Sequence, residues 1–348
     1  MLMPLATRAG PMLGRPARPR PGRRRPSAPV VLHSAPIVLP VSAAPLRDGA
    51  VVVRGDRVLQ VGARAELLAY FPVETEHRWP GMIVAGAVDA CAAGAPEPGV
   101  TARATVVRDP HEPAGLPGIA YVEVRSAAEE EWESRERDAV ITAIHEAERP
   151  GGCGLAARTR DPQVLEDMAV LARTFGLRLL ADLDAHAPVA LDEAGVLGPL
   201  CHVICSRPLD PGERKLLRLR RTAVAVGPAH PAADVLALLE EGNVVAFGCL
   251  GLPGGPLAQA ADVRRRAREL GLRPRALDRR LVAAATLGGA RALGMDQGAG
   301  RIGTLGPGAR ADFAVHDARG RYPYAALLAG APCAGTVLGG AIVAGAPQ

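Results

Sequence analysis

The chain has 348 residues, of which 48% are hydrophobic and only 3% are aromatic. A core of this composition has to be built from Ala, Val and Leu, and the length accommodates one large α/β barrel with a small accessory domain. No uninterrupted apolar run reaches the roughly 18 residues of a membrane-spanning helix, so we expect no membrane association.

The net charge of +5 comes from one end of the chain. Residues 1–26 contain seven arginines and no acidic residue, and the remaining residues carry a net charge of −2. A segment rich in Pro and Arg without hydrophobic periodicity is predicted to be disordered, so we assign residues 1–27 to a tail. Such a tail is basic enough to bind nucleic acid or an anionic surface. The near-neutral body gives no reason to expect nucleic acid elsewhere.

The cysteines and the basic residues indicate the kind of cell and compartment. Forty arginines stand against a single lysine, Lys215, a bias typical of a GC-rich bacterial genome. The six cysteines form no CxxC pair and no disulfide framework, which favours reduced thiols in a cytoplasmic protein.

The N-terminal third of the sequence favours short strands. Four apolar runs are separated by turn residues, and Gly55 allows the positive φ of a tight hairpin. These runs are Val30–Leu32, Ile37–Leu39, Ala50–Val53 and Val58–Val61. A short helix is expected at Arg64–Tyr70, and the continuous apolar run Met82–Val88 predicts a strand buried on both faces.

The middle of the sequence alternates between strand-like and helix-like segments, which predicts a parallel sheet close to an eight-stranded (β/α)₈ barrel. The expected strands are Thr105–Val107, Ile119–Val124, Gly154–Ala157, Leu177–Ala181, His202–Cys205, Ala223–Val226 and Val244–Gly248. The expected helices are Ser134–Glu148, Pro162–Phe175, Gly212–Arg220, Ala232–Glu240, Leu257–Leu270 and Asp278–Leu293. About ten residues separate Cys91 from Val100, and prolines there disfavour a helix, so the barrel is expected to be trimmed at this point.

Strand character returns at the C-terminus, in Asp312–His316 and Thr336–Val343. We therefore predict that both chain ends form one small β-rich composite domain, residues 28–80 with 302–348, and that residues 81–301 form the barrel.

Ordered sequence blocks at both ends carry a family resemblance. They are Asp48–Val53, Gly55–Val58, Pro80–Val84, Ala283–Thr286, Ala290–Gly294, Gly303–Asp312 and Val337–Val343. In this order and spacing they resemble the amidohydrolase superfamily, and most of all its imidazolonepropionase and aminodeoxyfutalosine deaminase groups. The resemblance implies a distorted (β/α)₈ barrel in which Zn²⁺ or Fe²⁺ activates water for hydrolysis of non-peptide carbon–nitrogen bonds.

The same resemblance implies a metal held by His-x-His after strand one, by histidines on strands five and six, and by Asp after strand eight. Here those positions are filled by Cys91 and Ala93, by Asp182, by Cys205 and by Leu250. Ala93 and Leu250 have no lone pair to offer a metal. We therefore expect no metal cofactor, and we assign no catalytic residue. We predict a catalytically impaired homologue that is kept as a binding or partner module.

An alternative stays open from the same residues. Cys91, Cys205 and Asp182 are of the types that bind Zn²⁺, so an active carbon–nitrogen hydrolase with an altered or metal-independent site is the second hypothesis. His186 and His230 follow strands that should end at the functional face, and they are the polar candidates for contacting a small molecule. A small molecule, a protein partner and a homo-oligomer are all compatible with this sequence.

Overall fold

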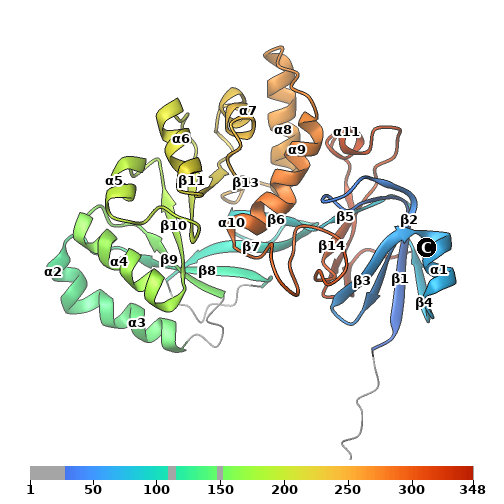
Figure 1. The fold of residues 1–348 in the computed structure, drawn as a ribbon, viewed down its shortest axis with the longest axis horizontal. Coiled ribbons are helices and arrows are strands. Elements are labelled where there is room, and N and C mark those ends of the chain that lie inside the picture. The colour runs from blue at the N-terminus through green and yellow to red at the C-terminus, as the bar shows by residue number, and fades with distance from the viewer. Residues whose placement is uncertain (1–27, 109–114, 147–151, 348) are drawn as a thin grey trace, which may run out of the picture.

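The computed structural model describes residues 28–108, 115–146 and 152–347. The predicted tail, residues 1–27, lies outside them. Two sheets organise the described chain, a composite sheet from both chain ends and a parallel barrel sheet from the middle (Figure 1). Among the described residues, no helix is long and apolar enough to cross a membrane.

The composite sheet confirms that the two chain ends form one β-rich unit. Its strands lie in the order β16-β15-β14-β5-β1-β2-β3, and β4 also pairs with β1. Their bounds are β1 Val30–Leu39, β2 Leu46–Arg54, β3 Arg57–Ala63, β4 Thr75–Arg78, β5 Met82–Ala85, β14 Phe313–His316, β15 Cys333–Leu338 and β16 Ala341–Ala344. Helices α1 (Arg64–Tyr70) and α11 (Pro323–Leu327) accompany this sheet.

The barrel sheet contains eight parallel strands in chain order, from β6 to β13, as the alternating pattern predicted. Their bounds are β6 Ala87–Ala92, β7 Val100–Val107, β8 Gly118–Val124, β9 Cys153–Ala157, β10 Arg178–Asp182, β11 Cys201–Cys205, β12 Ala223–Val226 and β13 Val245–Phe247. The helices are α2 Glu129–Glu131, α3 Arg137–Glu146, α4 Pro162–Phe175, α5 Pro188–Glu193, α6 Pro211–Leu219, α7 Ala232–Glu240, α8 Gly255–Glu269, α9 Leu277–Ala283 and α10 Gly289–Ala292, with π-helical segments at Trp132–Glu136 and Ala284–Gly288.

The trimmed connection lies where the sequence placed it. Residues 93–99 join β6 to β7 without a helix. The short connection removes no strand, and the barrel sheet still has eight. The second of them, β7, starts at Val100 and not at the expected Thr105.

The expected single strand Met82–Val88 is divided between the two sheets, which corrects our prediction. β5 pairs with β1 and β14 in the composite sheet, and β6 pairs with β7 in the barrel. Gly86 separates them, and a Cβ there would lie 1.9 Å from Thr101 Oγ1. The close approach requires glycine and lets the chain pass from one sheet to the other. The continuous apolar run arose because both halves are buried.

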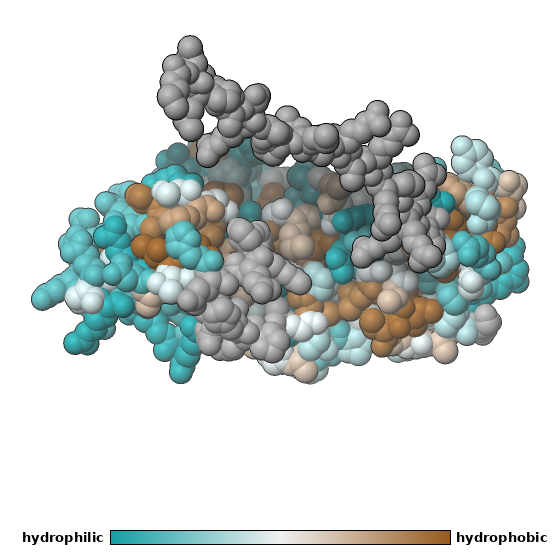
Figure 2. Space-filling model, turned by 90° about the horizontal axis from the view of Figure 1, so that it is seen from below, coloured by the Kyte–Doolittle hydropathy of each residue, from teal (hydrophilic) through white to brown (hydrophobic). Residues whose placement is uncertain are grey.

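Alternation along the barrel strands separates two cores. Small residues such as Ala90, Ala102 and Ala225 fill the barrel interior, where the largest side chain is Tyr121. Val and Leu from the opposite faces of the strands pack against the surrounding helices. Large exposed apolar side chains come from several separate elements, and Figure 2 shows apolar patches set among hydrophilic surface on one face.

Candidate functional site

The carboxyl ends of the barrel strands surround a small cavity of about 60 Å³. This is the end of a (β/α)₈ barrel at which active sites are built. The side chains that line it are Cys91, Ala156, Ala157, Arg158, Leu180, Asp182, Asp184, Ile204, Ser206 and Leu250.

Three of the residues singled out from the sequence meet at this cavity. Cys91 lies near the end of β6, Asp182 is the last residue of β10, and Leu250 follows β13. Leu250 has a left-handed φ of 52°, and its backbone N–H donates to the Cys91 carbonyl at 3.0 Å. A branched apolar residue therefore occupies a strained backbone position just beyond the end of β13.

Cys205, the candidate for the strand-six position, is not among the residues that line this cavity. Its side chain packs in the outer core between the barrel and the helices, and its Sγ donates to the Arg207 carbonyl at 3.1 Å. The residue of β11 that lines the cavity is its neighbour Ile204. Side chains alternate along a strand, so these two neighbours point to opposite faces of the barrel wall.

Ala93 also lies apart from the lining residues. It is exposed just beyond β6, and a Cβ on Gly251 would be 3.4 Å from the Ala93 Cβ. It therefore lies beside the loop after β13, outside the cavity.

The two candidate histidines connect loops and do not line the cavity. His186 is buried, with Nε2 2.6 Å from the Thr159 carbonyl oxygen and Nδ1 2.9 Å from that of Asp182. His230 is fully buried, with Nε2 2.7 Å from Asp234 Oδ2 and Nδ1 3.1 Å from the Cys205 carbonyl oxygen. Both ring nitrogens of each histidine are occupied by protein groups, so their part at this face is structural.

The sequence reasoning missed three polar residues of the cavity, Arg158, Asp184 and Ser206. Each lies just beyond the end of a barrel strand, which is the signal that identifies functional-face residues in this fold. Arg158 lies 3.7 Å from Asp182 and 3.5 Å from Glu123. Asp184 accepts backbone N–H groups from Ser206 and Arg207.

The donor set of the cavity does not fit a catalytic metal ion. Burial raises the pKa of the Cys91 thiol to about 12, so the thiol is neutral when no metal ion lies beside it. Asp182 accepts the Asp184 N–H at 2.9 Å and lies near Arg158, while Asp184 is held by its own backbone contacts. Within residues 28–108, 115–146 and 152–347, no three His, Cys, Asp or Glu side chains are grouped to hold a metal.

The barrel closes between β6 and β13 through a buried carboxylate that the sequence did not reveal. Asp89 Oδ1 accepts the Cys91 N–H at 3.1 Å and the Cys249 N–H at 3.0 Å. Burial raises the pKa of Asp89, and these two hydrogen bonds partly oppose the shift. Asp89 is thus a structural acid at the barrel seam.

A second buried polar pair lies inside the barrel. The Tyr121 hydroxyl is 3.2 Å from His202 Nδ1, and His202 Nε2 is 2.9 Å from the Ala90 carbonyl oxygen. Burial lowers the pKa of His202 to about 3, so the ring is neutral. A neutral ring satisfies both contacts when Tyr121 donates to Nδ1 and Nε2–H donates to Ala90.

Comparison with known proteins shows the fold. No protein-family model and no curated protein matches this chain. Among solved structures, a zinc-bound adenosine deaminase from Xanthomonas campestris is 17% identical with a TM-score of 0.72, covering 92% of this chain and 94% of that one. The guanine deaminase of E. coli is 16% identical with a TM-score of 0.71, covering 90% and 98%. The zinc complex of atrazine chlorohydrolase from Arthrobacter aurescens is 16% identical with a TM-score of 0.71, covering 91% and 95%.

By their names, these neighbours are two deaminases and a chlorohydrolase. The chain therefore has the fold of these solved structures, a near-closed parallel barrel with a composite sheet from both chain ends.

Proposed function

We propose that this chain is a non-hydrolytic binding protein built on the amidohydrolase fold. The observation that carries the proposal is the lining of the barrel-mouth cavity, where Ile204 and Leu250 stand among the strand ends and no histidine is present. The neighbouring structures are named as two deaminases, which hydrolyse carbon–nitrogen bonds, and a chlorohydrolase. Their fold is inherited here without a donor set suited to their metal, and a fold alone does not supply a chemistry.

The size of the cavity supports the same conclusion. Pockets that enclose small molecules have volumes of roughly 300–1,000 Å³. This cavity offers about 60 Å³, enough for ordered water but not for a purine or triazine ring, and a second cavity at this end, about 210 Å³ beside β13 and α8, is also below that range. The neutral Cys91 thiol has no histidine beside it in this cavity to act as a base, so a thiol nucleophile is not supported either.

We also propose a cytoplasmic location. All six cysteines are unpaired, and five of them are buried. Reduced thiols of this kind are typical of a reducing compartment.

Metal analysis together with a hydrolase assay tests the proposal. The full chain is expressed with added zinc, its metal content is measured, and ammonia release is followed with adenosine, guanine and an aminotriazine. We expect zinc far below one ion per chain and no release above the rate without protein.

A stoichiometric zinc ion that is lost in Cys91→Ser and Asp182→Asn would overturn the proposal and establish the altered-site enzyme. The matched control is Cys153→Ser, because Cys153 is a buried thiol on β9 that does not line the cavity. Ammonia release abolished by the same two substitutions, with or without bound metal, would also overturn it.

A further inference from the structure

A much larger groove lies on the composite sheet, away from the barrel mouth. Its volume is about 710 Å³, within the range of small-molecule sites. The groove forms because β1 changes partners along its length. It pairs with β4 through Val31–Ser34 and with β5 through Ile37–Leu39, and the chain steps between these two neighbours at Trp79 and Pro80.

One wall of the groove carries two arginines on a single carboxylate. Arg64 donates from Nε and Nη2 to Glu76 at 2.6 and 2.8 Å, and Ser34 Oγ donates to Glu76 at 2.7 Å. Arg78 Nε reaches the same carboxylate at 3.3 Å, while its side chain is 61% exposed. Glu76 compensates one of the two positive charges, and Asp48, which also acts on Arg64, offsets part of the other. The bidentate pair fixes Arg64, and the guanidinium of Arg78 keeps most of its surface open to solvent.

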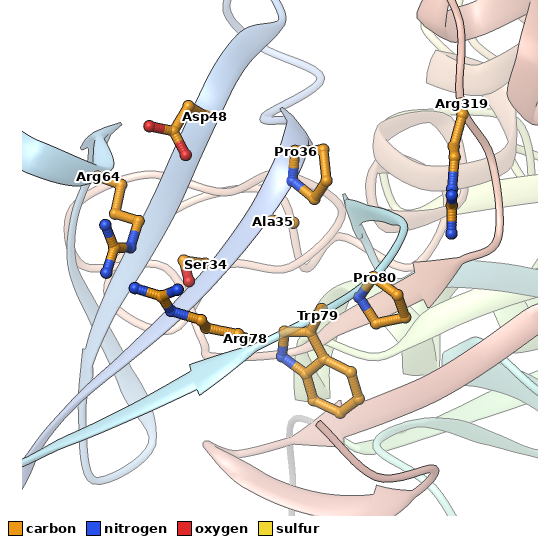
Figure 3. Close-up of a pocket in the computed structure, with 9 residues that line it drawn as sticks. All are labelled: Ser34, Ala35, Pro36, Asp48, Arg64, Arg78, Trp79, Pro80 and Arg319. Atoms are coloured by element: carbon orange, nitrogen blue, oxygen red, sulfur yellow. The ribbon is translucent and has the colours of Figure 1, made fainter. Parts of the chain in front are cut away.

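The opposite wall carries a third arginine. Figure 3 shows Arg319 across Trp79 and Pro80 from Arg64 and Arg78. Its contact with Asp317 is 3.6 Å long, and the two side chains are 70% and 56% exposed. An exposed pair of this kind contributes little, so an anion competes with Asp317 for Arg319 at small cost. Among the lining residues the one acidic side chain is Asp48, which Figure 3 shows beside Arg64, on the wall opposite Arg319.

The chemistry of the lining defines the ligand. Guanidinium groups present planar pairs of N–H donors that match phosphate oxygens, and charged hydrogen bonds of this kind are the strong ones. Trp79 is buried and the rest of the floor is small and apolar, so the lining offers no exposed ring on which a base could stack. Recognition therefore depends on the anionic groups of the ligand.

We propose that this groove binds a small phosphate-bearing ligand with at least two anionic groups. One group is held by Arg78 beside the fixed Arg64, and the other by Arg319 on the opposite wall. The proposal is independent of the barrel mouth, and it stands or falls separately from the absence of hydrolysis.

Calorimetric titration of the full chain tests this assignment. The probes are inorganic pyrophosphate, ADP and citrate, at low and at physiological ionic strength. We expect pyrophosphate and ADP to bind more tightly than citrate, with affinity falling as salt rises. Equal affinity for the two phosphates identifies the diphosphate as the recognised part. Tighter binding of ADP assigns additional contacts to the nucleoside and supports the same site.

Variants locate the binding in the groove. Arg78→Ala and Arg319→Ala are each expected to weaken pyrophosphate binding by about tenfold or more, the range for a lost charge-assisted hydrogen bond. Arg265→Ala is the matched control, because Arg265 is 60% exposed and paired with acids on α8, away from the groove. The arginine-rich residues 1–26 are unchanged in every variant, so a selective loss reports on the groove.

Three results would overturn the proposal. They are the absence of pyrophosphate and ADP binding to the full chain, binding that is unchanged in both groove variants, and citrate binding as tight as pyrophosphate binding. Circular dichroism of each variant separates a lost contact from a lost fold. Arg78→Lys, which keeps the charge but not the planar donor pair, is expected to recover only part of the affinity.

Discussion

Replacing Asp89 tests how the barrel is closed. The strand path from β6 to β13 leaves these two strands at its ends, and the Asp89 carboxylate accepts one N–H from each side of the seam, from Cys91 and from Cys249. Asp89→Ala leaves both buried donors without this acceptor. An unsatisfied buried polar group costs about 1–3 kcal/mol. Because Asp89 is 7% exposed and water can reach part of the gap, we expect a loss of about 2–4 kcal/mol.

The isosteric variant separates hydrogen bonding from charge. Asp89→Asn keeps an oxygen that accepts both N–H groups, and it removes a buried negative charge. Burial raises the pKa of Asp89, so its ionised form is disfavoured in the folded chain. This contribution to stability is full at low pH and is lost as pH rises from the ordinary value through the raised one. We therefore expect Asp89→Asn to lie within about 1 kcal/mol of the parent at neutral pH, or to be more stable.

Urea denaturation followed by far-UV circular dichroism measures both variants, and amide exchange at Cys91 and Cys249 reports on the seam itself. Glu130→Ala, a change of an exposed helical acid, is the control and should shift stability by no more than about 0.5 kcal/mol. The reasoning is refuted if Asp89→Ala is as stable as the parent, or if Asp89→Asn loses as much as Asp89→Ala.

Three further predictions follow from the same structure. Gly86→Ala places a Cβ 1.9 Å from a threonine hydroxyl, so we expect a loss of about 1–3 kcal/mol, whereas Gly198→Ala meets nothing within 4 Å and should be near neutral in the same thermal melt. Burial lowers the pKa of His33 and of His202 to about 3, so their neutral forms support the fold fully above pH 6.5 and this support is lost as pH falls toward 3. The free energies of unfolding from urea titrations at about pH 7.5 and about pH 5.5 should therefore differ by roughly 3 kcal/mol, and a flat profile contradicts this. Deletion of residues 1–26 should leave the melting temperature unchanged, because this segment has no apolar face to bury, and a drop of several degrees would show that it packs on the body.

Much of the fold could be predicted from local sequence patterns. Strand-to-helix alternation depends on periodicity within ten to fifteen residues, and it predicted the parallel barrel. The pairing of the two chain ends was predicted from the strand character that both ends share, as in Asp312–His316. The sequence also showed that Leu250 supplies no metal ligand, because its side chain has no donor atom in any orientation.

The remaining features depend on contacts between residues far apart in the chain. The division of Met82–Val88 at Gly86 is decided by the approach of Thr101, and the role of Asp89 is decided by an amide 160 residues away. Neither partner is encoded in the local sequence. The packing of Cys205 in the outer core likewise depends on the pairing of β11 with its neighbouring strands.

Cavity size is the last property that only the tertiary structure decided. The volume at a barrel mouth is the space left between side chains from many strands, so no single segment specifies it. The same holds for the composite-sheet groove, where Arg64, Arg78 and Arg319 come from separate elements. The sequence by itself determined which groups are available, and the packing of distant segments determined which of them face one another.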